Sequence, residues 1–248
     1  MTRGIYTIAS GGVAALARLD AASQNLANAG TAGYKAERAA FVLEPLSGGP
    51  RAGVDPILGQ TGAQVQQLGT MRDFSQGPIR MTGNPLDVAV SGSGFFVVQT
   101  PRGERYTRQG SFQRDPEGFL VTPVGDRVQG ENGDIRLGDG DVVIAEDGTV
   151  TVDDQAAGRL RLVDFGDKPR LVPEGGTLFA PVPGATGRPI PAVETHVVPS
   201  AIEGANVDAV HGLVELVDLA RGFESYMRAL QRLDEVTQHS IDDVGRVG

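Results

Sequence analysis

The side chains of this 248-residue chain that could perform chemistry are its three histidines and the aspartates of its middle part. His196, His211 and His239 are far apart in the sequence, and their surroundings do not match the ligand spacing of zinc sites. "GDGD" at 138–141 stands among further aspartates, but the EF-hand order, with Gly at the sixth place and Glu at the twelfth, is absent. Packing or solvated histidines and turn-capping aspartates are therefore favoured over metal sites.

The Gly- and Ser-containing motifs are equally poor in chemistry. "SGSG" at 91–94 lacks both the Gly-x-x-x-x-Gly-Lys phosphate loop and the dinucleotide fingerprint, so it predicts a turn between strands. The chain has no Gly-x-Ser-x-Gly elbow, no Ser-x-x-Lys pair and no cysteine, which removes the common nucleophiles, disulfides and zinc–thiolate sites. The sequence therefore predicts a protein that is not an enzyme, without catalytic residues, cofactor, metal or small-molecule substrate.

Composition and charge narrow the class of protein further. The net charge of −9 and the pI near 4.8 argue against nucleic-acid binding and against docking on an anionic membrane. The chain has no run of eighteen apolar residues, as a membrane-spanning helix would need. Thirty-five Gly and fifteen Pro indicate many tight turns, which is typical of β-rich architecture.

The N-terminal segment has the pattern of an amphipathic helix. Its apolar and small residues fall on alternating three- and four-residue steps, a period of about 3.5 that keeps them on one side: Ile5, Ile8, Gly12, Ala15, Leu19, Ala22 and Leu26. Asn28, Gly30 and Gly33 tolerate left-handed backbone angles, so the helix is expected to stop there.

The same period returns near residue 205, where Asn206 is the expected N-cap and Asp208 is placed to meet the positive end of the helix dipole. The stretch from Ser200 to Glu203 has capping-box spacing, but Gly204 follows and only a turn is expected. The later steps run through Leu213, Leu216, Ala220, Phe223, Met227, Leu230, Asp234, Thr237, Ile241 and Val244. Since neither apolar seam has a local partner, the simplest arrangement pairs the two helices antiparallel.

Between the helices the apolar period changes to two, as in "LDVAVSGSGFFVVQT" from Leu86 to Thr100. "DPEG" at 115–118 and later turn signals separate short apolar segments, of which 142–145, 149–152 and 159–165 are expected strands. Residues 41–84 are first Gly- and Pro-rich and then polar without a firm period. Residues 45–62 are expected to form a loop and residues 63–80 to be extended or irregular, so that 41–84 is an irregular connector.

These segments together predict an α+β fold. Residues 1–40 and 205–248 would form a discontinuous helical domain of paired N- and C-terminal helices, coiled-coil-like, with an antiparallel β-rich domain at 85–204 inserted between them. Ordering a helix costs roughly 1–2 kcal/mol per residue, whereas each apolar side chain of a seam contributes roughly 1.5–3 kcal/mol when fully buried. The helical pair is therefore expected to be marginal alone and to become firm only against other copies.

Three stretches of the chain resemble the signatures of one known family. "NLANAGTAGYK" (25–35) resembles an Asn-Leu-Ala-Asn stretch followed by Thr, Gly, an aromatic and Lys, with Gly30, Ala32 and Tyr34 in place of the usual Asn, Thr and Phe. "TGNPLDVAVSGSGFFVVQTPRGERYTRQGSF" (82–112) resembles the central signature. "EGANVDAVHGLVELVDLARGFESYMRALQRLDEV" (203–236) resembles the C-terminal signature, with mild departures at Leu213 and Glu215. In this order, the three stretches make the chain resemble the family of flagellar basal-body rod and hook proteins.

The resemblance implies a structural subunit that assembles with its own copies and with other rod proteins into the helical, torque-transmitting tube of the bacterial flagellar basal body. The length and the opening "GIYTIASGGVAAL" resemble the proximal rod type more than the distal rod type. The family also implies a periplasmic location reached through the flagellar type III export apparatus. That route fits an N-terminus whose apolar stretch is broken by Thr7, Ser10, Gly11 and Gly12, without the pattern of a cleaved signal peptide.

The residues expected to pack between subunits come from the two seams and the N-terminal signature: Ile5, Ile8, Leu19, Asn25, Leu26, Asn28, Leu213, Leu216, Ala220, Phe223, Met227, Leu230 and Ile241. Other interpretations stay open. The chain could be a distal rod or hook subunit of the same family, or an ordinary coiled-coil dimer. It could also be a soluble β-domain enzyme or carbohydrate-binding module with a coiled-coil oligomerisation stem, which would need a concave site with clustered acids and aromatics.

Overall fold

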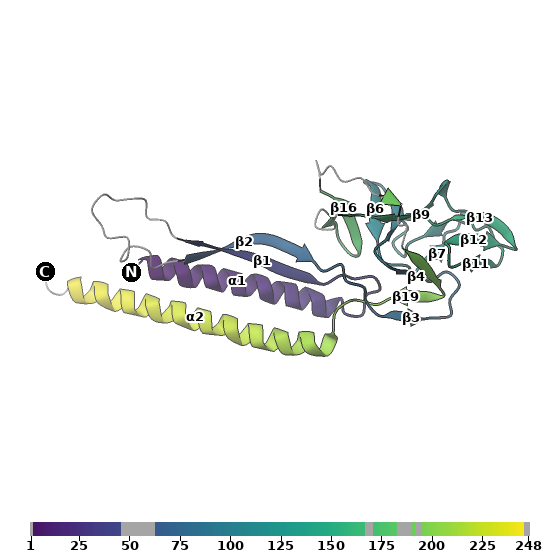
Figure 1. The fold of residues 1–248 in the computed structure, drawn as a ribbon. Coiled ribbons are helices and arrows are strands. Elements are labelled where there is room, and N and C mark those ends of the chain that lie inside the picture. The colour runs from purple at the N-terminus through teal and green to yellow at the C-terminus, as the bar shows by residue number, and fades with distance from the viewer. Residues whose placement is uncertain (1, 46–62, 167–170, 183–189, 192–194, 246–248) are drawn as a thin grey trace. The chain divides into compact units, whose positions relative to one another are not determined.

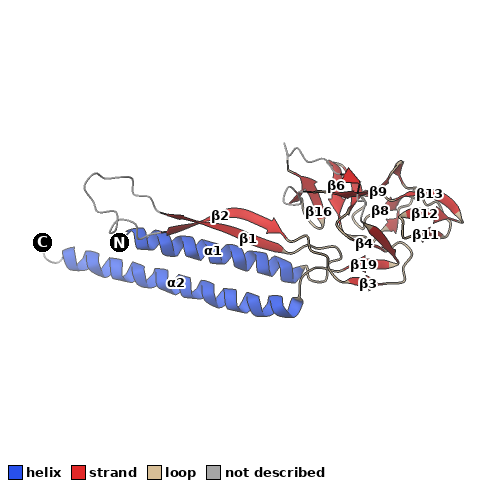
Figure 2. Ribbon diagram, in the orientation of Figure 1, coloured by secondary structure: helices blue, strands red, loops and turns tan. Residues whose placement is uncertain are grey.

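The computed structural model describes residues 2–45, 63–166, 171–182, 190–191 and 195–245. Within these residues a helix lies near each end of the chain and strands fill the middle, so the α+β fold predicted from the sequence is confirmed (Figure 1, Figure 2). The chain divides into two compact units. The helical unit contains Met1–Leu26, Glu37–Met71 and Ala209–Gly248, and the β unit contains Ala27–Ala36 and Arg72–Asp208.

Helix α1 (Thr2–Ala27) is rich in Ala and carries its apolar residues three and four positions apart, both of which favour a helix with one buried side. The helix ends where the sequence predicted. The amide of Thr31 donates to the carbonyl of Asn28 over 2.9 Å, and Gly33 adopts a φ of 70°, which residues with a Cβ rarely take.

Helix α2 (Ala209–Gly245) lies beside α1 in the helical unit (Figure 1). A Cβ added to Gly11 would come within 2.9 Å of Cε1 of Tyr226, and one added to Gly212 would lie 3.8 Å from Cδ1 of Leu26. The first part of each helix therefore contacts the later part of the other. Across the described residues, neither helix contains a stretch long and apolar enough to cross a membrane.

Strands β1 (Glu37–Pro45) and β2 (Ala63–Arg72) form a two-stranded sheet, and the guanidinium of Arg18 lies 5.2 Å from the ring centre of Phe41 in β1. Strand β2 agrees with the extended alternative that the sequence left open for 63–80. Its pairing with β1 was not predicted, because the segment has no firm period. Strand pairing joins backbone groups and does not itself require alternating side chains. The predicted loop began at Pro45, which is the last residue of β1, and its remainder at 46–62 lies outside the described residues.

The β unit is built from short antiparallel strands. The members of its largest sheet are β5 (Phe95–Thr100), β6 (Gly103–Thr107), β7 (Gln113–Arg114), β8 (Leu120–Val121), β9 (Arg127–Gly130), β10 (Gly133–Asp134), β14 (Leu162–Asp164), β15 (Leu171–Pro173), β16 (Leu178–Pro181) and β17 (Ile190–Pro191). The sheet has the order β15-β16-β6-β5-β9-β8-β7, with β10 on β9, β14 on β5 and β17 on β14.

Smaller sheets pack around the largest one. One contains β11 (Val142–Ile144), β12 (Thr149–Val152) and β13 (Gln155–Arg159), and this confirms the strands predicted at 142–145 and 149–152. The strand predicted at 159–165 is shorter, because Leu160 makes only an isolated bridge to Gly130 before β14 begins.

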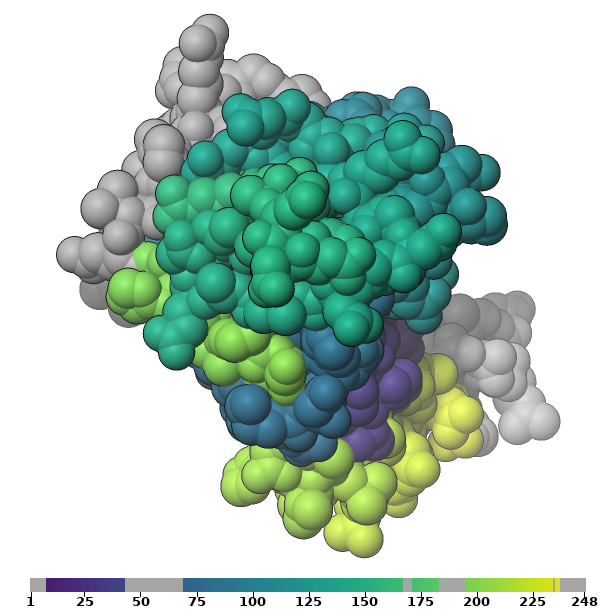
Figure 3. Space-filling model, turned by 90° about the vertical axis from the view of Figure 1, so that its right-hand side faces the viewer, coloured from purple at the N-terminus to yellow at the C-terminus, as the bar shows by residue number. Residues whose placement is uncertain are grey.

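Two further strand pairs join distant parts of the sequence. β4 (Val88–Ser91) pairs with β18 (His196–Pro199), and β3 (Ile79–Met81) pairs with β19 (Ala201–Glu203). In the space-filling view, blue atoms of the segment around residue 80 lie beside light-green atoms of the segment around residue 200 (Figure 3). The start and the end of the β unit are therefore paired with each other.

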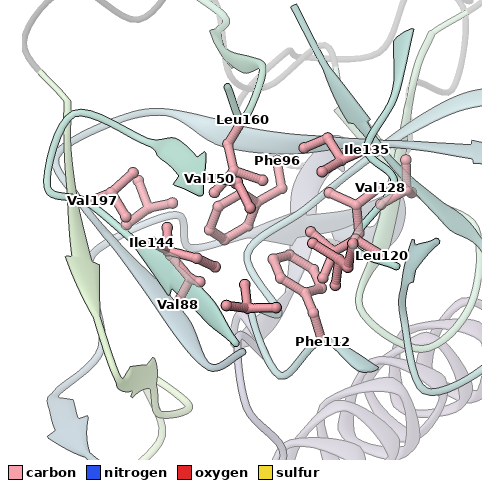
Figure 4. Close-up of a cluster of buried hydrophobic side chains, with 14 residues drawn as sticks. Val88, Phe96, Phe112, Leu120, Val128, Ile135, Ile144, Val150, Leu160 and Val197 are labelled. Carbon is pink, nitrogen blue, oxygen red and sulfur yellow. The ribbon is translucent and has the colours of Figure 1, made fainter. Parts of the chain in front are cut away.

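Two hydrophobic clusters fill the β unit, one on each side of β5. Because side chains alternate across a strand, Phe96 points into one cluster and its neighbour Phe95 points into the other. Figure 4 shows the first cluster, which gathers buried residues from several strands, among them Val88, Val150 and Val197.

We predict that Val150→Ala destabilises the β unit by about 1.5–3 kcal/mol, because Val150 is fully buried in the first cluster and the removed methyl groups leave a cavity. Chemical denaturation followed by circular dichroism measures the free energy of unfolding. The matched control is Val143→Ala on the neighbouring strand β11, since Val143 is 62% exposed. The control should cost less than about 1 kcal/mol, and equal losses from the two substitutions would contradict this core.

Candidate packing surface and buried ion cluster

The residues predicted to pack between subunits differ in exposure along α2. Half-buried side chains are those of Leu216, Ala220, Phe223 and Leu230, whereas Leu213 and Met227 are exposed. Ile5 and Ile241 lie within α1 and α2, but their side chains fall outside the described residues. Helix α2 therefore has a covered side and an open side.

The two sides of α2 are both apolar. Successive residues of a helix are about 100° apart, so Gly212, Leu216, Leu219, Phe223 and Leu230 share one face, and all of them are half-buried. The opposite face carries Val210, Leu213, Val214 and Val217, which are 76, 54, 59 and 43% exposed. We call these four residues the open face of α2. The contact of Gly212 with Leu26 belongs to the covered face.

The three- and four-residue steps in the sequence placed Leu213 in the same seam as Leu216 and left out the valines of the open face. The signal was present in "VHGLVELVDL", where valines at 210, 214 and 217 interleave with leucines at 213, 216 and 219. Two interleaved sets at helical spacing indicate two apolar faces. If only one apolar face is assumed, residues of the two sets are assigned to the same seam.

On α1 the predicted packing residues Ile8, Leu19 and Leu26 are half-buried. Among the α1 side chains that the structure describes, the exposed large apolar ones are instead Val13 and Leu16. Like α2, α1 therefore has exposed apolar side chains in addition to those that are half-buried within the single chain.

The two asparagines of the predicted packing set make hydrogen bonds within their own chain. Nδ2 of Asn25 donates to the carbonyl of Glu37, and the amide of Glu37 donates to Oδ1 of Asn25, each over 2.8 Å. Oδ1 of Asn28 accepts the hydroxyl of Thr31 over 3.3 Å. The first pair ties α1 to β1, and the second stabilises the turn that follows α1.

A buried ion cluster lies in the β unit and consists of Lys35, Arg108 and Glu203. Nζ of Lys35 donates to Oε1 of Glu203 over 2.7 Å, and Nη1 of Arg108 donates to Oε2 over 3.2 Å. No more than 1% of any of these three side chains is exposed. The carboxylate also accepts the amide of Gly77 over 2.8 Å. One buried group therefore joins its own strand to three other segments of the chain.

The two cations have partners besides the carboxylate. Nζ of Lys35 donates to the carbonyl of Ser75 over 2.7 Å, and Nη2 of Arg108 donates to the carbonyl of Gly92 over 2.7 Å. Burial lowers the pKa of the Lys35 ammonium below its usual 10.5, although the attraction of Glu203 opposes the shift. Two buried cations share one carboxylate. Glu203 therefore offsets the electrostatic cost of burying both of them.

Asn206 holds the same region together and does not cap α2. Its Oδ1 accepts the amide of Ala36 over 2.7 Å, and its Nδ2 donates to the carbonyl of Asp73 over 2.7 Å. Helix α2 begins at Ala209, so Asp208 stands at the N-cap position that the sequence assigned to Asn206. That prediction was wrong because the Asn206 amide bonds to distant backbone groups, which local spacing does not reveal.

Two glycines allow backbone segments to approach each other beside the ion cluster. A Cβ added to Gly33 would lie 2.3 Å from the amide nitrogen of Gln109, and one added to Gly77 would lie 2.1 Å from the carbonyl oxygen of Gly204. Both distances are too short for any side chain. The contact of Gly33 is the physical reason for a glycine in the "AGYK" part of the N-terminal signature.

Sequence analysis did not group Lys35, Arg108 and Glu203. A signal for Glu203 was present in "AIEGA", where Ala201, Glu203 and Ala205 alternate and all three are buried. In a strand with this alternation, the position of Glu203 is one where an apolar side chain is expected. A buried carboxylate there needs hydrogen-bond or ion-pair partners. The partner Lys35 is 168 residues away, so local spacing could not identify it.

One concave region of the described β unit offers little for catalysis or sugar binding. A cavity of about 460 Å³ is lined mainly by small residues and backbone, contains no aromatic residue, and has Asp208 as its one acid. The binding-module interpretation required clustered acids and aromatics, and this cavity does not meet that requirement. Within the described residues, no group of three or more His, Asp or Glu side chains could hold a metal ion.

Comparisons with known proteins identify relatives along most of the chain. The family model "Flagellar hook protein FlgE/F/G D1 domain" matches residues 89–152, and "Flagellar basal body rod FlgEFG protein C-terminal" matches residues 198–242. The chain is 32% identical to the flagellar basal-body rod protein FlgF of Caulobacter vibrioides over 92% of both chains. It is 32% identical to FlgF of Escherichia coli over 95% of both chains. It is also 32% identical to FlgG of Agrobacterium fabrum, over 94% of this chain and 96% of that protein.

We predict that Glu203→Gln destabilises the β unit by about 3–5 kcal/mol, because two buried cations lose the carboxylate that pairs with them. Denaturant unfolding measures the loss. Glu104→Gln is the matched control, since Glu104 forms an exposed ion pair with Arg161 over 2.8 Å. Surface pairs contribute about 0–1 kcal/mol, so similar losses in the two variants would contradict the role of the cluster.

We predict that the unsubstituted chain gains stability relative to Lys35→Met as the pH rises toward 10.5. Burial lowers the pKa of Lys35 in the folded chain, so between the lowered pKa and 10.5 the unfolded chain binds more protons than the folded chain. The free energy of unfolding then rises with pH, by up to about 1.4 kcal/mol per pH unit. The raised pKa of buried Tyr106 acts in both proteins and cancels. Denaturant unfolding across this range measures the difference, and parallel pH profiles would overturn the prediction.

Proposed function

The chain belongs to the family of flagellar hook and basal-body rod proteins, and we propose that it packs into the rod through the open face of α2. Its relatives FlgF and FlgG are basal-body rod proteins. The chain is therefore a structural subunit of the flagellar basal body that serves motility, and it is not an enzyme. It is of the FlgF type, with the FlgG type as the alternative.

Each helix of the helical unit has the other helix as its partner within the chain. We propose that α1 and α2 form an antiparallel, coiled-coil-like pair in a helical domain that is discontinuous in sequence. The contact of Gly11 with Tyr226 and that of Leu26 with Gly212 support this, since both pairs fit one antiparallel register. Gly11 and Gly212 leave room for large side chains, and so they allow close packing of the two helices.

The observation that carries the proposal is the second apolar face of α2. The open face of Val210, Leu213, Val214 and Val217 stays exposed in the single chain, and each such side chain contributes roughly 1.5–3 kcal/mol when it is fully buried. Contiguous exposed apolar surface marks protein–protein contacts. Other copies of the chain and other rod proteins are the partners that we propose for this face, and Val13 and Leu16 of α1 extend the apolar surface available to them.

We propose that the chain lies in the periplasmic, proximal part of the rod, and its similarity to FlgF proteins supports this proposal. We propose that the chain arrives there through the flagellar type III export apparatus. We also propose that α1 is retained in the assembled protein, because its removal would uncover the covered face of α2. We propose that the chain acts without a small-molecule substrate.

We predict that Leu213→Glu prevents incorporation into the rod while the isolated chain stays folded. Leu213 is 54% exposed, so the carboxylate remains hydrated in the single chain, but a neighbouring subunit would have to bury it without a partner. Motility and the protein content of isolated basal bodies measure incorporation. Circular dichroism of the purified chain checks that helices and strands are kept.

The matched control is His211→Glu, two residues away on the same exposed turn of α2 but outside the open face. It introduces the same carboxylate near the helix N-terminus, where negative charge is tolerated well. Rods of normal composition that contain the Leu213→Glu protein would contradict the packing proposal. A loss of rods in both variants would point to a general effect of charge and would also count against it.

A further inference from the structure

The segment 196–206 closes the β unit although it is the last part of that unit in the sequence. Its strand β18 pairs with β4 and its strand β19 pairs with β3. Val197 lies in the first hydrophobic cluster, and Ala201 and Glu203 are fully buried. We call residues 196–206 the closing segment.

The closing segment also binds the first part of the β unit. The amide of Gly33 donates to the carbonyl of Glu203 over 2.8 Å, and the amide of Asn206 donates to the carbonyl of Tyr34 over 3.4 Å. The Glu203 side chain adds the ion pairs with Lys35 and Arg108. The closing segment therefore joins residues 33–36, the end of β6 and the strands β3 and β4.

Detachment of this segment would leave an electrostatic problem in the rest of the unit. Without Glu203, Lys35 keeps the carbonyl of Ser75 and a weaker attraction to Asp73. Arg108 keeps the carbonyl of Gly92, the face of the Phe95 ring and a weaker attraction to Asp164. These interactions do not replace the ion pairs with Glu203. A buried charge whose partner is removed is strongly destabilising, so the remaining strands would open to hydrate both cations.

We propose that Glu203 is a folding latch, which makes the closing segment and the rest of the β unit open and close as one cooperative unit. A chain that is presented from its N-terminus, by synthesis or by export, then keeps Lys35 and Arg108 unpaired until Glu203 arrives 168 residues after Lys35. The β unit closes only once nearly all of its residues are available. The proposal concerns folding of the single chain and does not depend on packing into the rod.

Native-state hydrogen exchange of the full-length monomer, followed by mass spectrometry, tests the latch. Amides of the closing segment, of β4 and of β6 should exchange through one common opening reaction. Glu203→Gln should raise all three exchange rates by a common factor, on the order of 100-fold or more. Glu104→Gln is the control and should leave the three rates nearly unchanged.

A second variant separates a latch from ordinary packing and covers the case in which Glu203→Gln does not fold. The triple substitution Lys35→Met, Arg108→Met, Glu203→Met replaces the ion cluster by apolar side chains of similar length, which buried clusters can tolerate. In this variant the amides of the closing segment should exchange faster than those of β4 and β6, because detachment of the segment no longer leaves buried cations without a carboxylate. The proposal is overturned if the closing segment of the unsubstituted chain exchanges while β6 stays protected, or if all three segments still exchange together in the triple variant.

Discussion

The carboxylate of Glu203 is the group on which the arrangement of the β unit depends. It is fully buried, it pairs with the ammonium of Lys35 and the guanidinium of Arg108, and it accepts the amide of Gly77. Because buried charges are costly without their partners, this one side chain fixes the relative positions of four segments. The close backbone contacts of Gly33 and Gly77 and the hydrogen bonds of Asn206 lie in the same region and agree with that arrangement.

The helical unit is stabilised in a different way. Its helices have no buried ion cluster among the described residues, and α2 keeps apolar side chains on two opposite faces, only one of which is half-buried. A unit that leaves the open face of α2 in water gains stability from a further partner. The described part of the β unit thus buries two hydrophobic clusters within the single chain, whereas the open face of α2 stays available for the packing that we propose.

Sequence analysis predicted those features that depend on local patterns. The three- and four-residue steps predicted both helices, and the period of two with its turn signals predicted strands such as β11 and β12, because one element determines each pattern. The ion cluster could not be predicted, since Lys35 and Glu203 meet only through the fold. The pairing of β1 with β2 was not predicted because their segments show no apolar alternation. The valines of the open face were missed because two apolar sets interleave along one helix.

A reconstruction of the assembled flagellar rod at side-chain resolution, by electron microscopy, tests the packing claim most directly. The account predicts that Val210 and Val214 lie buried against a helix of a neighbouring subunit, while the face that carries Gly212 and Phe223 packs on α1 of the same chain. Val210 and Val214 facing solvent in the assembled rod, or an α2 whose covered face packs on the α1 of a different subunit, would contradict it.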